Sequence, residues 1–387
     1  MKPDYNRRQL LYLCFVIFLA PAVRLIPVTT ASAAGSASWL SPLLALPISL
    51  AYLLFLTEFM KSRRTGEGAG ELMLRFGGPV VGPAALVFTA AFLFFYCGFL
   101  LHSGASRFTA TIYPAATPQP FIYTALVIGT VAALGPMKAI VRSAKIFALL
   151  IIAVLLIVVL LAIDSLSLER LLPIIPEKPS ALLKSTLPVT DVLTGAVVYA
   201  AFAEFGAPVY SGRFRAYARW MLLCAVLLSL MTAAIVGSYG ATLSAELLYS
   251  FFTLTRGISL FGSLERVEAF IVAIWLFPDF ITFALMAASG MRCLQLAFGY
   301  RPSADPKRRS SFKNGRWLIF PGIAATLATT FFIPSDAESL KVLSEVVVPF
   351  LNAGVLLLIL PLCYVTGRLK KAQKSPPQSC LPLTREP

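Results

Sequence analysis

The sequence predicts an all-α integral membrane protein with ten transmembrane helices. Of its 387 residues, 58% are hydrophobic and only 13% are charged, and the mean hydropathy is +0.80. Apolar runs of about 20 residues, which is the length that crosses a bilayer as a helix, recur along the chain. Membrane-spanning strands would instead show short segments of alternating hydropathy, so the continuous runs favour helices.

The apolar runs define ten spans with short polar segments between them. These spans cover residues 9–33, 39–60, 79–103, 119–136, 143–164, 189–209, 217–240, 266–298, 316–334 and 342–367. The first run is long and is followed by further spans, so we expect no cleavable signal peptide. We expect residues 1–368 to form a single transmembrane domain and residues 369–387 to form a disordered cytoplasmic tail.

The distribution of Lys and Arg orients the spans. With the N-terminus in the cytoplasm, 25 of the 33 basic residues fall in cytoplasmic segments and 6 in outer segments, while Arg24 and Arg266 lie within spans. Positive charge concentrates on the cytoplasmic side of membrane proteins. The ratio therefore predicts that both termini are cytoplasmic, and it explains the basic composition through contact with the lipid bilayer rather than with nucleic acid.

The first span of each five-span half contains residues that interrupt helices. Pro21 and Pro27 occur in the first span, and Gly206 and Pro208 occur in the sixth. Proline removes an amide donor and clashes with the preceding turn, and Pro21 lies about 18 Å along its span, near the middle of the membrane. Breaks at corresponding positions predict a five-plus-five inverted repeat with broken helices 1 and 6 around a central ligand site. Ordinary kinks are the alternative.

Charged and aromatic residues near these breaks are the candidate ligand groups. Arg24 is a cation inside the first span, and Glu204 and Asp279 are acids inside later spans. A buried guanidinium is normally paired. Arg24 therefore either binds a ligand carboxylate, or closes a gate with one of these acids, or belongs to a structural ion pair. Aromatic residues in the same region either line the pocket or serve only packing. The predicted pocket comprises Ala20, Pro21, Arg24, Tyr96, Tyr199, Phe202, Glu204, Gly206 and Asp279.

Residues 256–279 concentrate charge at the start of the eighth span. Five residues recur there at spacings of three and four and so share one helical face: Glu265, Glu268, Val272, Trp275 and Asp279. Glu265 and Glu268 lie at the outer end, where the helix dipole favours acids. We expect Glu265, Arg266 and Glu268 to form an outer lock or an assembly contact. Helix capping with a local ion pair to Arg256 or Arg266 is the alternative.

This stretch resembles the hallmark of the spore germination GerAB-like family, the membrane-embedded B subunits of endospore germinant receptors. The matching residues are Arg256, Ile258, Ser259, Leu264, Glu265, Arg266, Val267, Glu268, Ala269 and Trp275. The resemblance implies a member of the amino acid–polyamine–organocation transporter superfamily with a LeuT-like core. It also implies assembly with a receptor A subunit and a lipoprotein C subunit in the spore inner membrane.

The resemblance favours a subunit that senses a small amino acid or a similar nutrient and triggers germination. An amino-acid permease of the same superfamily is the alternative, because sensing and transport both use a pocket at mid-membrane. A membrane enzyme is not expected, since the single histidine, His102, has no catalytic triad, metal or phosphate-loop pattern around it. The six cysteines are scattered without a CxxC pair, so neither a metal site nor a cofactor is expected.

Overall fold

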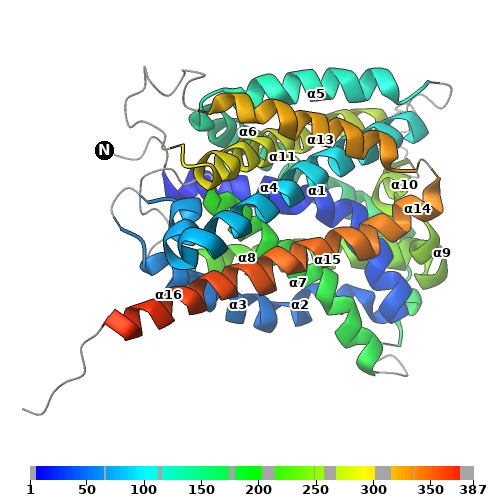
Figure 1. Ribbon diagram of the computed structural model, residues 1–387. Coiled ribbons are helices and arrows are strands. Elements are labelled where there is room, and N and C mark those ends of the chain that lie inside the picture. The colour runs from blue at the N-terminus through cyan, green and yellow to red at the C-terminus, as the bar shows by residue number, and fades with distance from the viewer. Residues whose placement is uncertain are drawn as a thin grey trace, which may run out of the picture.

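A computed structural model describes residues 6–64, 67–111, 116–173, 179–202, 214–247, 249–256, 267–300, 315–334 and 336–374, and every regular element within these ranges is helical. Figure 1 shows long helices that run side by side across the molecule, with the N-terminus and the end of the last helix at the same, left-hand side. The predicted all-helical class is confirmed for this part of the chain.

The long helices are α1 (Arg7–Ala34), α3 (Leu46–Lys61), α4 (Ala69–Thr111), α5 (Gln119–Leu134), α6 (Met137–Leu161), α7 (Pro179–Phe202), α8 (Phe214–Tyr239), α11 (Val267–Ala297), α13 (Ile319–Phe332) and α16 (Leu360–Lys374). Shorter elements connect or extend them: η1 (Gly35–Leu40), α2 (Ser41–Leu44), η2 (Ala162–Ser165), η3 (Leu168–Leu171), α9 (Ala241–Glu246), α10 (Ser250–Arg256), η5 (Arg316–Leu318), α14 (Ala337–Val342), η6 (Leu343–Val347), α15 (Val348–Ala353) and η7 (Gly354–Ile359).

Seven helical stretches are long and apolar enough to cross a membrane: Leu25–Lys61, Ala69–Ala110, Met137–Ser165, Pro179–Phe202, Phe214–Tyr239, Phe270–Ala297 and Glu338–Leu369. Shorter apolar helices cover Arg8–Leu19, Gln119–Leu134 and Arg316–Phe332. Each predicted span overlaps one of these segments. The chain is therefore a multi-pass membrane protein, while the count of ten spans stays a prediction.

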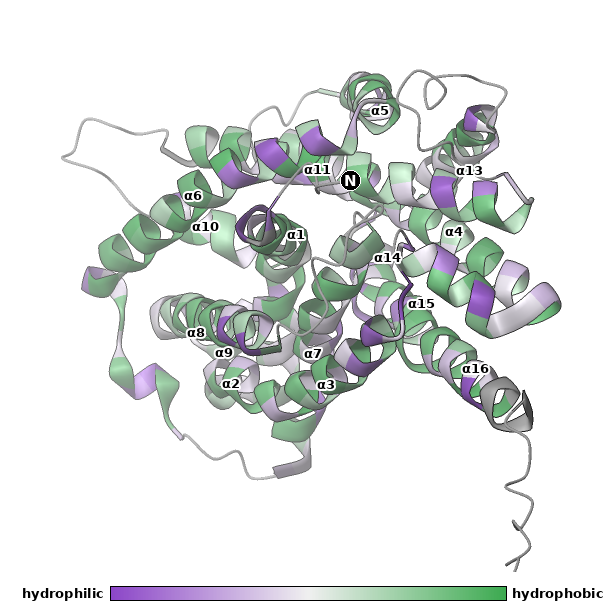
Figure 2. Ribbon diagram, turned by 90° about the vertical axis from the view of Figure 1, so that its left-hand side faces the viewer, coloured by the Kyte–Doolittle hydropathy of each residue, from purple (hydrophilic) through white to green (hydrophobic). Residues whose placement is uncertain are grey.

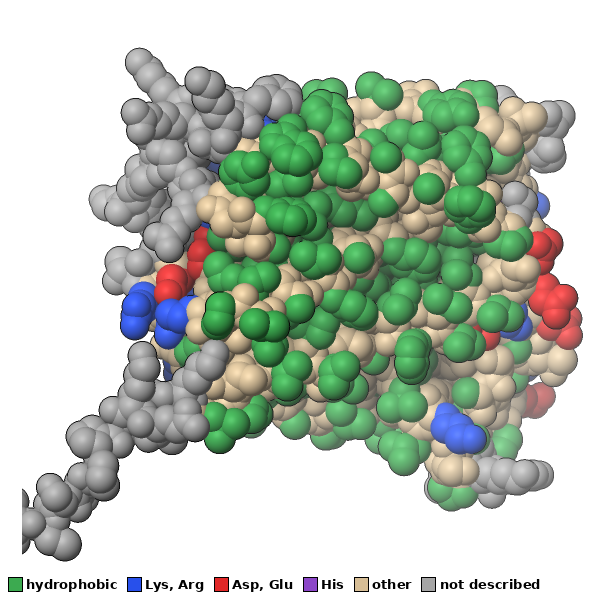
Figure 3. Space-filling model, viewed as in Figure 1, with side chains coloured by type: hydrophobic (Ala, Val, Ile, Leu, Met, Phe, Trp, Pro, Cys, Tyr) green, Lys and Arg blue, Asp and Glu red, His purple; other side chains and the backbone are tan. Residues whose placement is uncertain are grey.

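Hydrophobic side chains cover the middle of the molecule, and charged ones gather towards its two ends (Figure 3). Figure 2 shows the same hydrophobic character on the outer helices. Val131 on α5, Ile146 on α6 and Phe350 on α15 are among the large apolar side chains that face outward. Such exposure suits contact with lipid, whereas water would make it unfavourable.

Helix α1 lies inside the bundle. Every described side chain from Leu13 to Ala31 is buried, and α1 packs against α6, α7, α8 and α11. A helix that is apolar on all sides can be enclosed by other helices without burying unpaired polar groups, and most of α1 is apolar. The other extensive pairing joins α4 to α11.

The break predicted in the first helix is wrong, because α1 is one continuous α-helix through Pro21 and Pro27 over the described residues 7–34. Each proline loses one backbone hydrogen bond. Neighbouring helices and hydroxyl groups can compensate such a loss inside a membrane protein. The carbonyl that Pro27 leaves without its helical donor is that of Val23; the nearby Thr29 and Thr30 hydroxyls donate instead to the Leu25 and Ile26 carbonyls, at 2.9 and 2.5 Å.

The third predicted span differs in length from its helix. α4 extends past both predicted ends and is bent at Gly78, whose φ of 73° lies in the left-handed region that favours glycine. Its last two turns include Arg107, which the charge count had assigned to an outer loop. The guanidinium is instead fully buried.

The tenth predicted span combines α-helical and π-helical turns. Its sequence of elements is α14, η6, α15, η7 and α16, in which η6 and η7 are π-helical. Pro349 follows η6 and has no N–H to donate to the preceding turn, which favours a wider turn there. The last helix continues to Lys374, so it includes residues 369–374, which we had expected to belong to a disordered tail.

Ion pairs connect the segments at one end of the bundle. Arg75 on α4 donates from Nε and Nη2 to the two carboxylate oxygens of Glu67, both at 2.8 Å, and Arg292 on α11 pairs with Glu71 on α4. Partial burial acts to raise the pKa of Glu67, but the hydrogen bonds from Arg75 and from the Arg64 backbone outweigh it, so the pKa is lowered. These contacts fix the turn between α3 and α4.

Candidate functional site

A cavity lies between α1, α4, α7, α11 and the η6–α15 turns of the tenth span. Its volume is about 40 Å³, room for a few water molecules in this packing of the helices. Apolar side chains form most of the wall, among them Ile17, Ile26, Phe92, Met286 and Val348. Six residues with polar groups interrupt it: Thr29, Tyr96, Asp191, Tyr199, Ser344 and Asn352. An apolar wall with a few polar groups is typical of a binding site for a small organic molecule.

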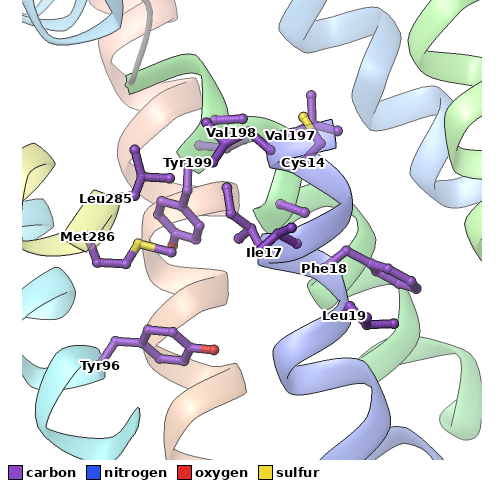
Figure 4. Packing of buried hydrophobic residues seen from close by; sticks show 14 of the residues in the cluster. Cys14, Ile17, Phe18, Leu19, Tyr96, Val197, Val198, Tyr199, Leu285 and Met286 are labelled. Atoms are coloured by element: carbon purple, nitrogen blue, oxygen red, sulfur yellow. The ribbon is translucent and has the colours of Figure 1, made fainter. Parts of the chain in front are cut away.

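Side chains from four helices meet beside this cavity (Figure 4). Ile17 on α1, Tyr199 on α7 and Met286 on α11 point towards one another, and Tyr96 extends from α4 towards α1. Phe92 stacks on both tyrosines, with ring centroids 6.0 Å from each and interplanar angles of 28° to Tyr96 and 26° to Tyr199. The three rings therefore form an aromatic wall that joins α4 to α7.

The polar groups of α7 share one face. Asp191, Gly195 and Tyr199 follow at intervals of four residues, which places them above one another along the helix. Across from them, Asn352 on α15 accepts a hydrogen bond from the Tyr199 hydroxyl. Its amide nitrogen donates to the Asp191 backbone carbonyl at 3.4 Å. These two bonds determine which end of the Asn352 amide faces each partner.

Gly195 allows this close approach of α7 and α15. A Cβ atom at this position would lie 3.1 Å from the Asn352 amide nitrogen and 3.4 Å from the Tyr199 ring. Any larger residue would push the amide away from its partners. The glycine is therefore needed for packing against Asn352.

A buried ion pair joins α4 to α11 farther along the bundle. Arg107 donates from Nη2 to Oδ2 of Asp279 at 2.6 Å, and the two side chains are only 1% and 7% exposed. The guanidinium also lies 5.2 Å from the ring centroid of Phe252, which in turn packs against Trp275 at 5.8 Å. A cation in this setting is held by a carboxylate and an aromatic face together.

This ion pair is separate from the cavity wall. Asp279 precedes Met286 by seven residues, or about 10 Å along α11, and neither Arg107 nor Asp279 borders the cavity. The carboxylate packs beside Gly104, where a Cβ would lie at an ordinary contact distance of 3.7 Å from Asp279 Oδ2. The acid that we expected to face the pocket, or to pair with Arg24, is thus bound to Arg107.

The other predicted pocket residues divide into two groups. Tyr96 and Tyr199 line the cavity, whereas Phe202 is buried beyond it at the end of α7. Glu204 and Gly206 lie outside the described residues, as do the side chains of Ala20, Pro21 and Arg24 on α1. The predicted break in the sixth helix falls among residues 203–213 and is likewise outside the described part.

The described residues of the family-like motif belong to α10 and to the first half of α11. Trp275 is completely buried and packs against Phe251 and Phe252 of α10, while Arg256 is the exposed last residue of α10. Glu265 and Arg266 fall outside the described residues, and so does the side chain of Glu268. The predicted common face of this helix is confirmed for Val272, Trp275 and Asp279, which are all buried.

Sequence reasoning missed Asp191, Asn352, Phe92 and Arg107. Asp191 lies near the start of the predicted span 189–209, but α7 begins ten residues before that span and places Asp191 midway along the described helix. Asn352 is a single amide in an apolar run, with no local signal of its role. Among the described residues, no group of three or more His, Cys, Asp or Glu side chains converges as a metal site would require.

Comparison with known proteins identifies a family and a shared fold. The family described as spore germination protein matches residues 6–332 of the chain. The structure is similar to that of a Na+-coupled sialic acid symporter in its substrate-bound outward-open state, with a TM-score of 0.58 and 13% sequence identity. The match covers 92% of this chain and 80% of the symporter, and at this identity it shows a shared fold. No curated protein matches the chain.

Proposed function

Because the chain belongs to the spore germination protein family, we propose that it is the nutrient-sensing subunit of a spore germinant receptor. In this proposal a small amino acid or similar nutrient binds in the cavity between α1 and α7 and triggers germination. The observation that carries the proposal is the cavity itself. It combines an apolar wall, an aromatic surface and a polar corner within a permease-like fold.

Ligand binding would act by selecting one of two packings of the helices around the cavity. The cavity lies between α1 and α7 on one side and α4 and α11 on the other. The Arg107–Asp279 ion pair ties α4 to α11, so these two helices would move as one body. A change of helix packing of this kind is a signal that partner subunits can read. Moving an equilibrium from 1:99 to 99:1 requires about 10⁴-fold tighter binding to the favoured packing.

Family membership supports a proposal for the partner subunits and the location of the protein. We propose assembly with a receptor A subunit and a lipoprotein C subunit in the spore inner membrane, with both chain termini in the cytoplasm. The exposed Arg256 is the last residue of α10, and it precedes the other motif residues in sequence. We assign Glu265, Arg266 and Glu268 to an outer lock or an assembly contact.

A second function, secondary transport of an amino acid, is favoured by one observation. The chain shares its fold with a Na+-coupled symporter over most of its length. A sensor needs only to bind its ligand, whereas a transporter must also open the cavity to each side of the membrane in turn. Measurement of uptake separates these functions.

The test is a deletion strain that is compared with a complemented strain. Germination of purified spores is scored against a panel of amino acids, sugars and nucleosides, and uptake of isotope-labelled nutrients is measured in parallel. A sensor predicts loss of germination with at least one nutrient, restored by complementation, while uptake stays unchanged. Loss of uptake of the same nutrient would instead assign transport. An unchanged germination profile would contradict the receptor assignment.

A further inference from the structure

We propose that Asp191 binds the primary ammonium group of the nutrient, so that the cavity selects small organic cations and zwitterions with a short apolar part. This inference rests on the proposed function, because it concerns the ligand of the same cavity. It places the group that binds the charge of the ligand on α7, beside α15, rather than at the breaks that we predicted in the first and sixth spans.

The first argument is the position of the carboxylate. Asp191 lies midway along the 24-residue helix α7, about 18 Å from its first residue. It lines the cavity, and its side chain is only partly accessible. An ionised carboxylate at this depth is unfavourable unless a cation accompanies it. Among the described residues that line the cavity, none is Lys, Arg or His, so a cationic ligand would supply that partner.

The second argument is the direction of the cavity's hydrogen bonds. The Thr29 hydroxyl donates to the Leu25 carbonyl and the Ser344 hydroxyl to the Lys341 carbonyl, each at 2.9 Å. The Tyr199 hydroxyl donates to Asn352 Oδ1. Each hydroxyl proton is thus used within the protein, which leaves the oxygen lone pairs as acceptors. An ammonium group has three donors and no acceptor, so it fits these oxygens, whereas a carboxylate does not.

The third argument is the aromatic wall. The stacked rings of Tyr96, Phe92 and Tyr199 border the same cavity as Asp191. A cation within about 6 Å of an aromatic centroid is attracted by the ring face. Ile17 and Met286 complete the wall with aliphatic surface. The ligand that matches these groups has an ammonium end and a branched or straight hydrocarbon end.

The experiment uses the purified full-length chain in lipid nanodiscs and measures its thermal unfolding midpoint. The probes are L-valine, its decarboxylated form isobutylamine and its deaminated form isovalerate, each titrated to saturation, with glucose and inosine as amine-free nutrients. We expect L-valine and isobutylamine to raise the midpoint and isovalerate to leave it unchanged. Asp191→Asn should weaken the response to isobutylamine about 10- to 100-fold, the factor expected for loss of a charge-assisted hydrogen bond.

Two variants control for loss of folding. Asp164→Asn makes the same chemical change at an exposed position outside the cavity and should leave the response intact. Asp191→Glu keeps the charge and should retain a weaker response. If Asp191→Asn does not fold, the contrast between isobutylamine and isovalerate on the unaltered protein still decides the matter.

Several results would overturn the inference. A response to isovalerate, glucose or inosine but not to isobutylamine would contradict the role of Asp191 and leave the proposed function standing. The absence of a response to every amine would have the same meaning. Na+ could also raise the unfolding midpoint more than K+ does, with this difference lost in Asp191→Asn and with no effect of isobutylamine. That result would assign Asp191 to an inorganic cation instead. Strong coupling between Arg24→Gln and Asp191→Asn in a double-mutant cycle, with unchanged amine binding, would assign an internal ion pair.

Discussion

Removing one partner of the buried Arg107–Asp279 pair is predicted to destabilise the protein strongly. The contact measures 2.6 Å between nitrogen and oxygen, and both side chains are almost entirely buried. Either Arg107→Met or Asp279→Asn leaves one buried charge without its partner, which costs about 3–5 kcal/mol in such sites. The free energy of unfolding, measured by denaturant titration in mixed micelles, should fall by this amount in each single variant.

The double variant and an exposed pair provide the controls. Arg107→Met combined with Asp279→Leu removes both charges, so its stability should lie closer to that of the unaltered protein than either single variant does. Lys61→Gln breaks the Lys61–Glu58 pair, whose side chains are 50% and 56% exposed, and should change stability by at most about 1 kcal/mol. Single-variant losses no larger than that of Lys61→Gln, or losses that simply add in the double variant, would refute the reasoning.

Two further substitutions test the packing of the cavity and the outer end. Gly195→Ala places a methyl group 3.1 Å from the Asn352 amide and should raise the nutrient concentration for half-maximal germination about fivefold to a hundredfold, consistent with overpacking of about 1–3 kcal/mol. Gly354→Ala meets nothing closer than the Phe88 ring at 3.8 Å and should leave this midpoint unchanged. An equal effect of both would contradict the role of Gly195. Glu268→Ala should reduce copurification of the receptor subunits or shift all nutrient responses together, whereas normal assembly with altered specificity for one nutrient would show that Glu268 contacts the ligand.

The helices were predictable from the sequence because their signal is local. An apolar run such as 143–164 has few other stable forms in a bilayer, and α6 covers most of it. The common face of Val272, Trp275 and Asp279 followed in the same way from helical spacing. Family membership was also predictable, since the motif that carries it lies within a single stretch of 20 residues.

The polar contacts of the site were not predictable because they join distant parts of the chain. Tyr199 and Asn352 are 153 residues apart in sequence, and Arg107 and Asp279 are 172 apart. Hydropathy alone placed Arg107 beyond the end of its helix, although a buried carboxylate and an aromatic face allow the helix to carry it inward. Because charged groups inside a membrane are normally paired, Asp279 was expected to have a cationic partner, but the sequence could not identify which arginine pairs with it.

Proline gave a misleading signal in the first helix. Its local effect at Pro21 and Pro27 is unfavourable by about 3 kcal/mol in a helix interior. However, α1 is enclosed by other helices along its length, and an unwound segment there would expose further backbone groups to an apolar interior. Tertiary packing therefore outweighs the local preference. The positions of the prolines alone do not reveal whether packing or the local preference prevails.

The most direct test of the central claim, that the cavity beside α1 and α7 senses the nutrient, is the germination dose-response of variant spores. Asp191→Asn and Tyr199→Phe each change a polar side chain that lines the cavity on α7. We predict that at least one variant shifts or abolishes the response to a particular nutrient while protein levels stay normal. Unchanged dose-responses in both variants, at normal protein levels, would contradict the assignment of the sensing pocket.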